Sequence, residues 1–196
     1  MTEKRIRAFV AEDDPIELAG FCTILEDLGY EVVGKAGTGK KAVDGILRTK
    51  PDIILMDINM PDLDGISVLE AVNEVQLFPC IMITGYRDIT LSERASKAGV
   101  FGYLQKPVDE IDIQAAIRVA LSKYAEFKEL RLKLRKSEKA LQDRKIIEKA
   151  KGILMDKMGM AEAHAQNYII KRSRDTNRKM VEVANEIIRR QEELNF

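Results

Sequence analysis

The sequence is poor in histidine and cysteine, the residue types that most often build metal centres and redox frameworks. His164 is its only histidine, and Cys22 and Cys80 are its only cysteines. The two cysteines lie far apart in apolar surroundings, without the short spacings of a zinc site. We therefore expect two reduced, buried thiols, and neither a disulfide framework nor a cysteine-based metal site.

Long hydrophobic runs are also lacking. No apolar run approaches the roughly 20 residues that a membrane-spanning helix needs. The polar residues 1–5 lead directly into the apolar run 6–11, without the longer apolar stretch and small-residue cleavage site of a signal peptide. The sequence therefore predicts a cytoplasmic protein with no membrane partner.

Charge is balanced overall, with 32 basic and 32 acidic residues, but it is unevenly distributed. Residues 1–120 carry 13 basic and 20 acidic residues, a net charge of −7. Residues 121–142 carry 7 and 3, a net of +4, and residues 143–196 carry 12 and 9, a net of +3. An acidic front half and a basic back half predict two modules with different partners.

The first 120 residues alternate two kinds of segment. Short apolar runs rich in Val and Ile occupy residues 6–11, 31–34, 53–56, 80–84 and 100–104. Amphipathic stretches follow them, at residues 16–28, 40–48, 66–75, 89–98 and 111–120. Five strand–helix units of this kind predict an α/β domain over residues 1–120, with a parallel sheet covered by helices on both faces.

The remainder of the chain has helical patterns only. Residues 121–142 contain neither Gly nor Pro, and heptad spacing relates Phe127, Leu130, Leu134 and Leu141, with Ser137 at the position that would complete the seam. This pattern predicts a coiled-coil-like linker helix that continues out of the first domain and pairs with a second copy of the chain. A lone helix packed on its own domain is the alternative.

Residues 143–196 predict an all-α module. Three amphipathic segments cover about 143–158, the stretch that begins near 161, and about 178–194, and Gly159 ends the first of them. Three short helices of this kind form a small bundle with a modest core.

Charged and hydroxyl side chains stand at the carboxyl ends of four predicted strands. The first strand is followed by Glu12 and Asp13, the third by Asp57, the fourth ends in Thr84, and the fifth is followed by Lys106. In a doubly wound sheet these ends converge near the point where the strand order reverses. Three carboxylates favour a hard cation such as Mg²⁺. An aspartate nucleophile beside an ammonium and a hydroxyl suits phosphoryl transfer.

The motifs around these residues resemble the receiver domain of bacterial two-component systems. They are Val-Ala-Glu-Asp-Asp, Ile-Leu-Met-Asp-Ile-Asn-Met-Pro-Asp-Leu-Asp-Gly, Met-Ile-Thr-Gly and Gly-Tyr-Leu-Gln-Lys-Pro. The resemblance implies a flavodoxin-like (βα)5 fold, a cis bond before Pro107 and a sensor histidine kinase as partner. It also implies the roles of single residues: Asp57 as phosphoacceptor, Mg²⁺ held by Glu12, Asp13, Asp57 and the Asn59 carbonyl, phosphoryl contacts from Thr84 and Lys106, and Tyr103 as the switch aromatic. Glu12 stands where the family more often has Asp.

The basic segment around residues 171–179 carries five cations near Tyr168 and could contact phosphates, with the aromatic ring available to stack on a base. A solvated turn and a core tyrosine are the bland alternatives. Runs such as Asp-Arg-Lys-Ile-Ile-Glu-Lys-Ala-Lys-Gly-Ile-Leu-Met and Asp-Thr-Asn-Arg-Lys-Met-Val-Glu-Val-Ala are similar to the ANTAR domain of transcription antitermination regulators. Gln166 and Arg174 depart from the family pattern, in which an aromatic and often a Met stand at these positions.

The ANTAR resemblance implies binding to hairpin RNA in leader transcripts, by an activated homodimer. From charge and location we expect phosphate contacts from Lys145, Lys149, Lys151, Arg172, Arg174, Arg178 and Lys179, and a base contact from Tyr168. Two alternatives remain open, a DNA-binding response regulator and a receiver linked to a protein-interaction scaffold. An enzymatic output is not expected, because no nucleophile–base set follows residue 120.

Overall fold

The chain folds into two compact units, which are described separately. The computed structural model describes residues 5–85, 94 and 98–194. The first unit comprises Met1–Lys128 and the second comprises Glu129–Phe196. One helix, α5 (Glu110–Met158), contributes residues to both units.

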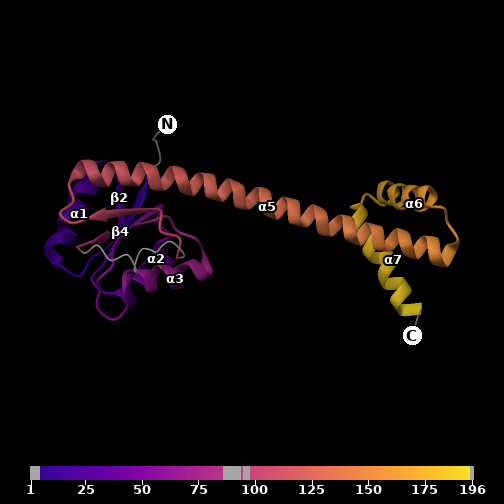
Figure 1. Ribbon diagram of the computed structural model, residues 1–196, viewed down its shortest axis with the longest axis horizontal. Helices are drawn as coiled ribbons and strands as arrows, with labels where there is room; N and C mark the ends of the chain where they lie inside the picture. Colours follow the sequence, from indigo (N-terminus) through magenta and orange to yellow (C-terminus); the bar gives the residue numbers. More distant parts are fainter. Residues whose placement is uncertain (1–4, 86–93, 95–97, 195–196) are drawn as a thin grey trace. The chain divides into compact units, whose positions relative to one another are not determined.

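A five-stranded parallel sheet forms the centre of the first unit (Figure 1), in the order β2-β1-β3-β4-β5. The elements are β1 (Arg7–Ala11), α1 (Pro15–Asp27), β2 (Glu31–Ala36), α2 (Gly39–Thr49), β3 (Ile53–Asp57), α3 (Gly65–Val75), β4 (Cys80–Thr84), β5 (Gly102–Gln105) and α5. The predicted α/β class is confirmed. The helix expected at residues 89–98 falls outside the described residues, except for positions 94 and 98.

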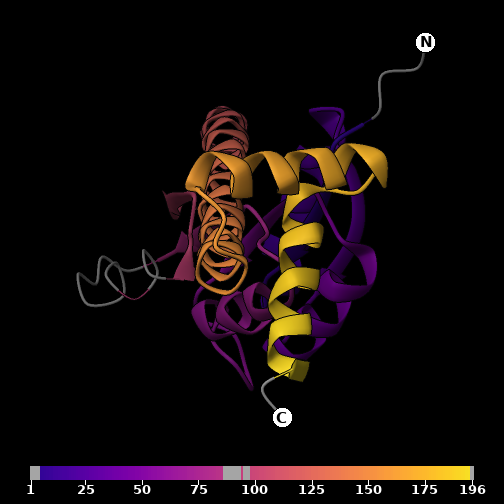
Figure 2. The same ribbon diagram turned by 90° about the vertical axis from the view of Figure 1, so that its right-hand side faces the viewer.

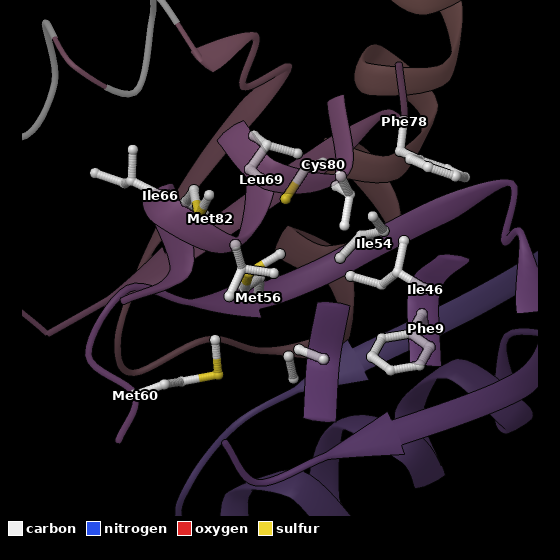
Figure 3. Close-up of a cluster of buried hydrophobic side chains, with 14 of the residues drawn as sticks. Phe9, Ile46, Ile54, Met56, Met60, Ile66, Leu69, Phe78, Cys80 and Met82 are labelled. Carbon is white, nitrogen blue, oxygen red and sulfur yellow. The ribbon is translucent and has the colours of Figure 1, made fainter. Parts of the chain in front are cut away.

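Both faces of the sheet are buried, which explains why its central strands are almost wholly apolar. All five residues of β3 are buried. Because successive side chains point to opposite faces, Phe9 and Ile54 join a core cluster with residues of α2 and α3 (Figure 3). Val10 and Leu55 join a second cluster with residues of α1 and α5.

Polar caps determine where the helices begin at the carboxyl edge of the sheet. Asp14 Oδ1 accepts hydrogen bonds from the backbone N–H groups of Ile16 at 2.7 Å and Glu17 at 3.1 Å, and Pro15 occupies the first turn of α1. Asp64 caps α3 in the same way, through the N–H of Ser67 at 2.9 Å. Both helices therefore start close to the ends of the strands that carry the acidic residues.

The first unit extends along α5 beyond residue 120 through an aromatic cluster. The ring of Phe101, which precedes β5, meets Tyr124 edge-on with centroids 5.6 Å apart, and meets Phe127 at 6.3 Å. The Tyr124 hydroxyl donates a hydrogen bond to the Leu77 carbonyl at 3.1 Å. These contacts hold the segment of α5 around Tyr124 and Phe127 against the first unit.

The middle of α5 is exposed. Leu130, Leu134 and Leu141, which share the predicted heptad seam, are 67%, 57% and 56% exposed. Charged residues surround them, and Lys133 pairs with Glu129 one turn away at 2.7 Å. Although α5 has 49 residues, none of the described helices combines the length and apolar character needed to cross a membrane.

The second unit is a small three-helix module, as predicted. It packs the last turns of α5 against α6 (Glu162–Asp175) and α7 (Met180–Leu194), as Figure 2 shows. Partly buried Ile and Met side chains surround its buried core, which consists of Ala150, Leu154, Ala165, Ile169, Val183 and Ala184. The helix expected from residue 143 is not separate, because α5 continues unbroken to Met158 and ends before Gly159, which has a positive φ of 63°.

Gly65, the first residue of α3, lies directly against the backbone of Asp57. A Cβ atom at Gly65 would lie 2.2 Å from the Asp57 carbonyl oxygen, which is backbone and cannot rotate away. We expect Gly65→Ala to lower the free energy of unfolding by about 1–3 kcal/mol, the usual cost of overpacking. Urea unfolding followed by circular dichroism measures this loss.

Gly20 provides the matched control. It lies within α1 with open space around a Cβ atom, so Gly20→Ala should stabilise the protein by about 0.5–1 kcal/mol through its helix propensity. Equal effects of the two substitutions would show that backbone crowding at Asp57 is not what requires glycine at position 65.

Candidate functional site

Three carboxylates meet at the carboxyl ends of β1 and β3. Oxygens of Glu12, Asp13 and Asp57 all lie within 4.8 Å of one another. Glu12 and Asp57 are buried, at 1% and 4% exposure, whereas Asp13 is exposed. The sheet topology thus brings together the three acidic residues that the sequence placed at two different strand ends.

Burial makes the negative charges of this cluster unfavourable. It raises the pKa of Asp57, although the nearby Lys106 ammonium and the N–H groups of Ile58 and Asn59 act in the opposite direction. Burial also raises the pKa of Glu12, against the hydrogen bond from Lys106. Two crowded, desolvated carboxylates are stabilised by any cation that reaches them.

Lys106 supplies one such positive charge. Its Nζ lies 2.9 Å from Glu12 Oε2 and 3.6 Å from Asp57 Oδ1, and it also contacts Oε2 of Glu17. Partial burial alone would lower the pKa of Lys106, but hydrogen bonds with Glu17 and Glu12 raise it above its usual value. The ammonium therefore stays charged beside Asp57 at neutral pH.

Backbone pairing between β4 and β5 places the remaining candidates of the first unit. Thr84 ends β4, and its carbonyl accepts the Lys106 N–H at 2.9 Å, so these two residues are held side by side. The Lys106–Pro107 bond is cis, as the resemblance implied. The Asn59 N–H donates to Asp57 Oδ2 at 3.2 Å. Tyr103, on β5, is 43% exposed and lines an open pocket of about 370 Å³ formed with α5.

The candidate RNA contacts of the second unit fall into two groups, residues held in ion pairs between its elements and residues exposed on its surface. Lys151 is almost buried, with its ammonium 2.9 Å from Glu148 and 3.1 Å from Glu162. The hydrogen bonds that Lys151 donates, first to Glu148 and then to Glu162, raise the pKa of Lys151. The position joins α5 to α6, so this lysine has little exposed charge with which to meet a ligand.

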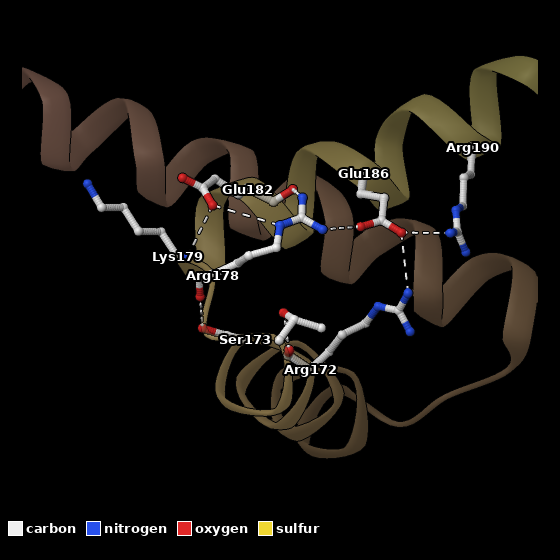
Figure 4. Close-up of polar contacts among 8 residues, drawn as sticks. Arg172, Ser173, Arg178, Lys179, Glu182, Glu186 and Arg190 are labelled. Atoms are coloured by element: carbon white, nitrogen blue, oxygen red, sulfur yellow. Dashed lines mark hydrogen bonds and ion pairs between the residues drawn. The ribbon is translucent and has the colours of Figure 1, made fainter.

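Glu186 gathers three arginines on the surface of the second unit (Figure 4). Its carboxylate accepts from Arg178 at 2.6 Å, from Arg190 at 2.7 Å and from Arg172 at 3.3 Å. The hydrogen bond from Arg178 is the main reason why the pKa of Glu186 lies below its usual range. Arg172 and Arg178, both expected to meet phosphates, are thus tied to α7 while part of each side chain remains exposed.

The second group of candidate RNA contacts consists of exposed residues. Lys145, Lys149, Arg174 and Lys179 all lie on the surface, and Lys149 has Glu192 as a distant partner at 3.8 Å. Tyr168 on α6 is 37% exposed. These four cations are therefore the most accessible of the candidate phosphate contacts, and the ring of Tyr168 is also accessible to solvent.

The sequence pattern did not predict two acidic residues of these clusters, Glu17 beside Lys106 and Glu186 beside the three arginines. Glu17 lies one helical turn after the acidic run that begins at Glu12, and Glu186 stands four residues before Arg190 and eight after Arg178. Such spacings occur on many solvated helix faces, so spacing alone did not single them out.

The doubly wound sheet and the acidic cluster beside Lys106 define the first unit as a response-regulator receiver. The sequence matches the family model of the response regulator receiver domain over residues 8–118, and that of the ANTAR domain over residues 135–188. The chain belongs to the family of two-component response regulators that join a receiver to a C-terminal ANTAR domain.

Individual relatives agree with this assignment. The chain is 34% identical to the transcriptional regulatory protein PdtaR of Mycobacterium tuberculosis over 93% of its own length and 89% of that protein. It is 39% identical to the transcriptional regulatory protein DesR of Bacillus subtilis over 60% of its length and 59% of that protein. A CheY-like receiver domain protein of Methanospirillum hungatei has 30% identity and a TM-score of 0.59, covering 63% of this chain and 98% of that structure.

Burial of the Asp57 charge predicts a stability gain when that charge is removed. Because the pKa of Asp57 is raised by burial, the folded state holds its proton more tightly than the unfolded state, and stability falls as the pH rises between the two pKa values. Asp57→Asn should therefore raise the urea midpoint at pH 7 without Mg²⁺. Lys106 keeps its ion pairs with Glu12 and Glu17 in this variant, so it is not left without a partner. The difference should shrink as the pH falls toward the ordinary carboxyl range.

Asp44→Asn, at an exposed carboxylate of α2, is the matched control and should leave the midpoint nearly unchanged. Mg²⁺ at ten times its dissociation constant should stabilise the wild type by about 1.4 kcal/mol and the Asn variant by less. An Asp57→Asn midpoint equal to or below that of the wild type would contradict the burial argument.

Proposed function

We propose that this response regulator is phosphorylated on Asp57 by a sensor histidine kinase and controls transcription antitermination by binding hairpin RNA in leader transcripts. One observation carries the proposal: a single chain combines a buried aspartate beside Lys106 with an ANTAR domain. The corresponding domains are the receiver at 1–120, the linker helix at 121–142 and the RNA-binding module at 143–196.

The acidic cluster fits Mg²⁺. Glu12, Asp13 and Asp57 offer hard oxygen donors within 4.8 Å of one another, and two of them are carboxylates whose buried charge needs compensation. The Asn59 carbonyl, two residues after Asp57, would complete the protein's share of the ligands. Bound there, the cation would neutralise charge on a phosphoryl group.

The protein's own groups then account for the transfer. An oxygen of the Asp57 carboxylate forms a bond to phosphorus, the bond from phosphorus to the kinase histidine nitrogen breaks, and the nitrogen keeps the electron pair. Lys106 and Thr84 would meet the phosphoryl oxygens, because backbone pairing holds them together at the ends of β5 and β4. Tyr103, exposed on β5, would report the change on the surface that faces α5.

The output step would use the exposed cations of the second unit. Lys145, Lys149, Arg174 and Lys179 are available for RNA phosphates, with partial contributions from Arg172 and Arg178, and Lys151 is the least accessible. Tyr168 remains the candidate for a base contact, since its ring is exposed beside this group.

Dimerisation would join two such modules. Leu130, Leu134 and Leu141 leave an apolar stripe on α5 that the described part of the chain does not cover. Pairing this stripe with its copy would bury it as a coiled-coil seam. Two RNA-binding modules linked in this way engage two hairpins with greater avidity than either has alone.

A gel-shift assay with a two-hairpin leader RNA from the protein's own genome tests the proposal. The full chain is incubated with Mg²⁺, with or without acetyl phosphate, beside an Asp57→Ala variant. We expect the phosphodonor to tighten RNA binding on the order of tenfold in the wild type and not in the variant. Absence of RNA binding in every state, with Asp57 phosphorylated, would favour a protein-interaction output.

The exposed cations should also differ from the paired ones in their effect on RNA affinity. Arg174→Gln and Lys179→Gln should each weaken binding and reduce the salt slope by about one, whereas Lys41→Gln, on the exposed surface of α2, should change neither. Lys151→Gln should lower the thermal midpoint and leave the salt slope of RNA binding nearly unchanged. The reverse order, with Lys151 dominating the slope, would contradict the assignment from exposure.

A further inference from the structure

Lys106 has a partner outside the acidic cluster. Its ammonium contacts Glu17 Oε2 in addition to Glu12 at 2.9 Å and Asp57 at 3.6 Å. Glu17 comes from the first turn of α1, and the Asp14 cap, which accepts its backbone N–H at 3.1 Å, holds that turn at the site. One ammonium is therefore shared among three carboxylates.

The three carboxylates differ in what they lose when Lys106 moves. The side chain of Glu12 is 1% exposed, so without the ammonium its charge would lack water and keep only the long hydrogen bond from the Asp14 N–H, at 3.4 Å. The Glu17 side chain is 43% exposed and can return to solvent at little cost. Glu17 is thus the partner that can yield when a new negative charge appears on Asp57.

We propose that Glu17 is a positioning residue that holds Lys106 in the unphosphorylated protein and competes for it with the phosphoryl group on Asp57. This inference rests on the proposed phosphorylation of Asp57. The competition sets how readily the site accepts phosphate, because Lys106 must shift its contact from Glu17 to the phosphoryl oxygens.

With acetyl phosphate as donor, the step is the formation of a bond from an Asp57 oxygen to phosphorus. The bond from phosphorus to the acetyl oxygen breaks, and acetate leaves with the electron pair. The incoming phosphoryl group is negatively charged, so the Glu17 carboxylate opposes it twice, by repulsion and by occupying Lys106. Replacing Glu17 by the neutral isostere Gln removes the repulsion and releases Lys106. Both changes favour phosphorylation.

The experiment compares the wild type with Glu17→Gln in the full chain, with Mg²⁺ and limiting acetyl phosphate. The rate of Asp57 phosphorylation is followed on gels that retard the phosphorylated form. We expect the variant to react roughly twofold to fivefold faster, the range set by a partly exposed ion pair. Glu26→Gln, at an exposed carboxylate near the other end of α1, is the matched control and should react like the wild type.

A double-mutant cycle distinguishes positioning from general charge or altered folding. In a Lys106→Gln background, Glu17→Gln should accelerate the reaction less than it does in the wild type, because only the repulsion by Glu17 is left to remove. An undiminished acceleration in that background would overturn the route through Lys106, and equal rates of Glu17→Gln and wild type would overturn the proposal as a whole. If the wild type accepts no phosphate at all, the proposed function fails and this inference with it.

Discussion

The burial of two carboxylates at the end of an apolar sheet is the constraint on which the first unit depends. Glu12 and Asp57 are largely shielded from water, because β1 and β3 are buried on both faces and end at this point. Such a pair needs a cation, and Lys106 meets part of that need. The same deficit makes the edge receptive to a divalent ion and to a reaction that changes the charge on Asp57.

The second unit balances charge differently. Its apolar core is small, and ion pairs at the surface also connect its helices. Glu186 joins α7 to α6 through Arg172 and to the α6–α7 connection through Arg178, and Lys151 joins α5 to α6 through Glu162. Basic residues in this module therefore fall into two groups. Some hold the helices together, and others, including Arg174 and Lys179, remain exposed on the surface.

The helix α5 carries three environments in one uninterrupted element. Ile113 and Ile117 cover the sheet, Tyr124 and Phe127 meet Phe101 beside β5, and Leu130 and Leu134 are exposed. Phe101 precedes the strand that carries Tyr103 and leads to Lys106. Strand β5 therefore lies between the residue that contacts Asp57 and the residue that packs against Tyr124 and Phe127 of α5.

Much of this organisation could be predicted from the sequence, because it depends on local pattern and topology. Alternating apolar runs specify strands and helices, and a parallel sheet brings the residues at its strand ends together. The sequence alone therefore places Glu12, Asp13, Asp57, Thr84 and Lys106 at one edge of the sheet. Only the tertiary structure decided which charges pair. The contacts of Lys106 with Glu17, of Lys151 with Glu162 and of Arg172 with Glu186 join different elements, and they depend on side-chain directions at helix–helix and helix–strand contacts that no spacing along the chain encodes.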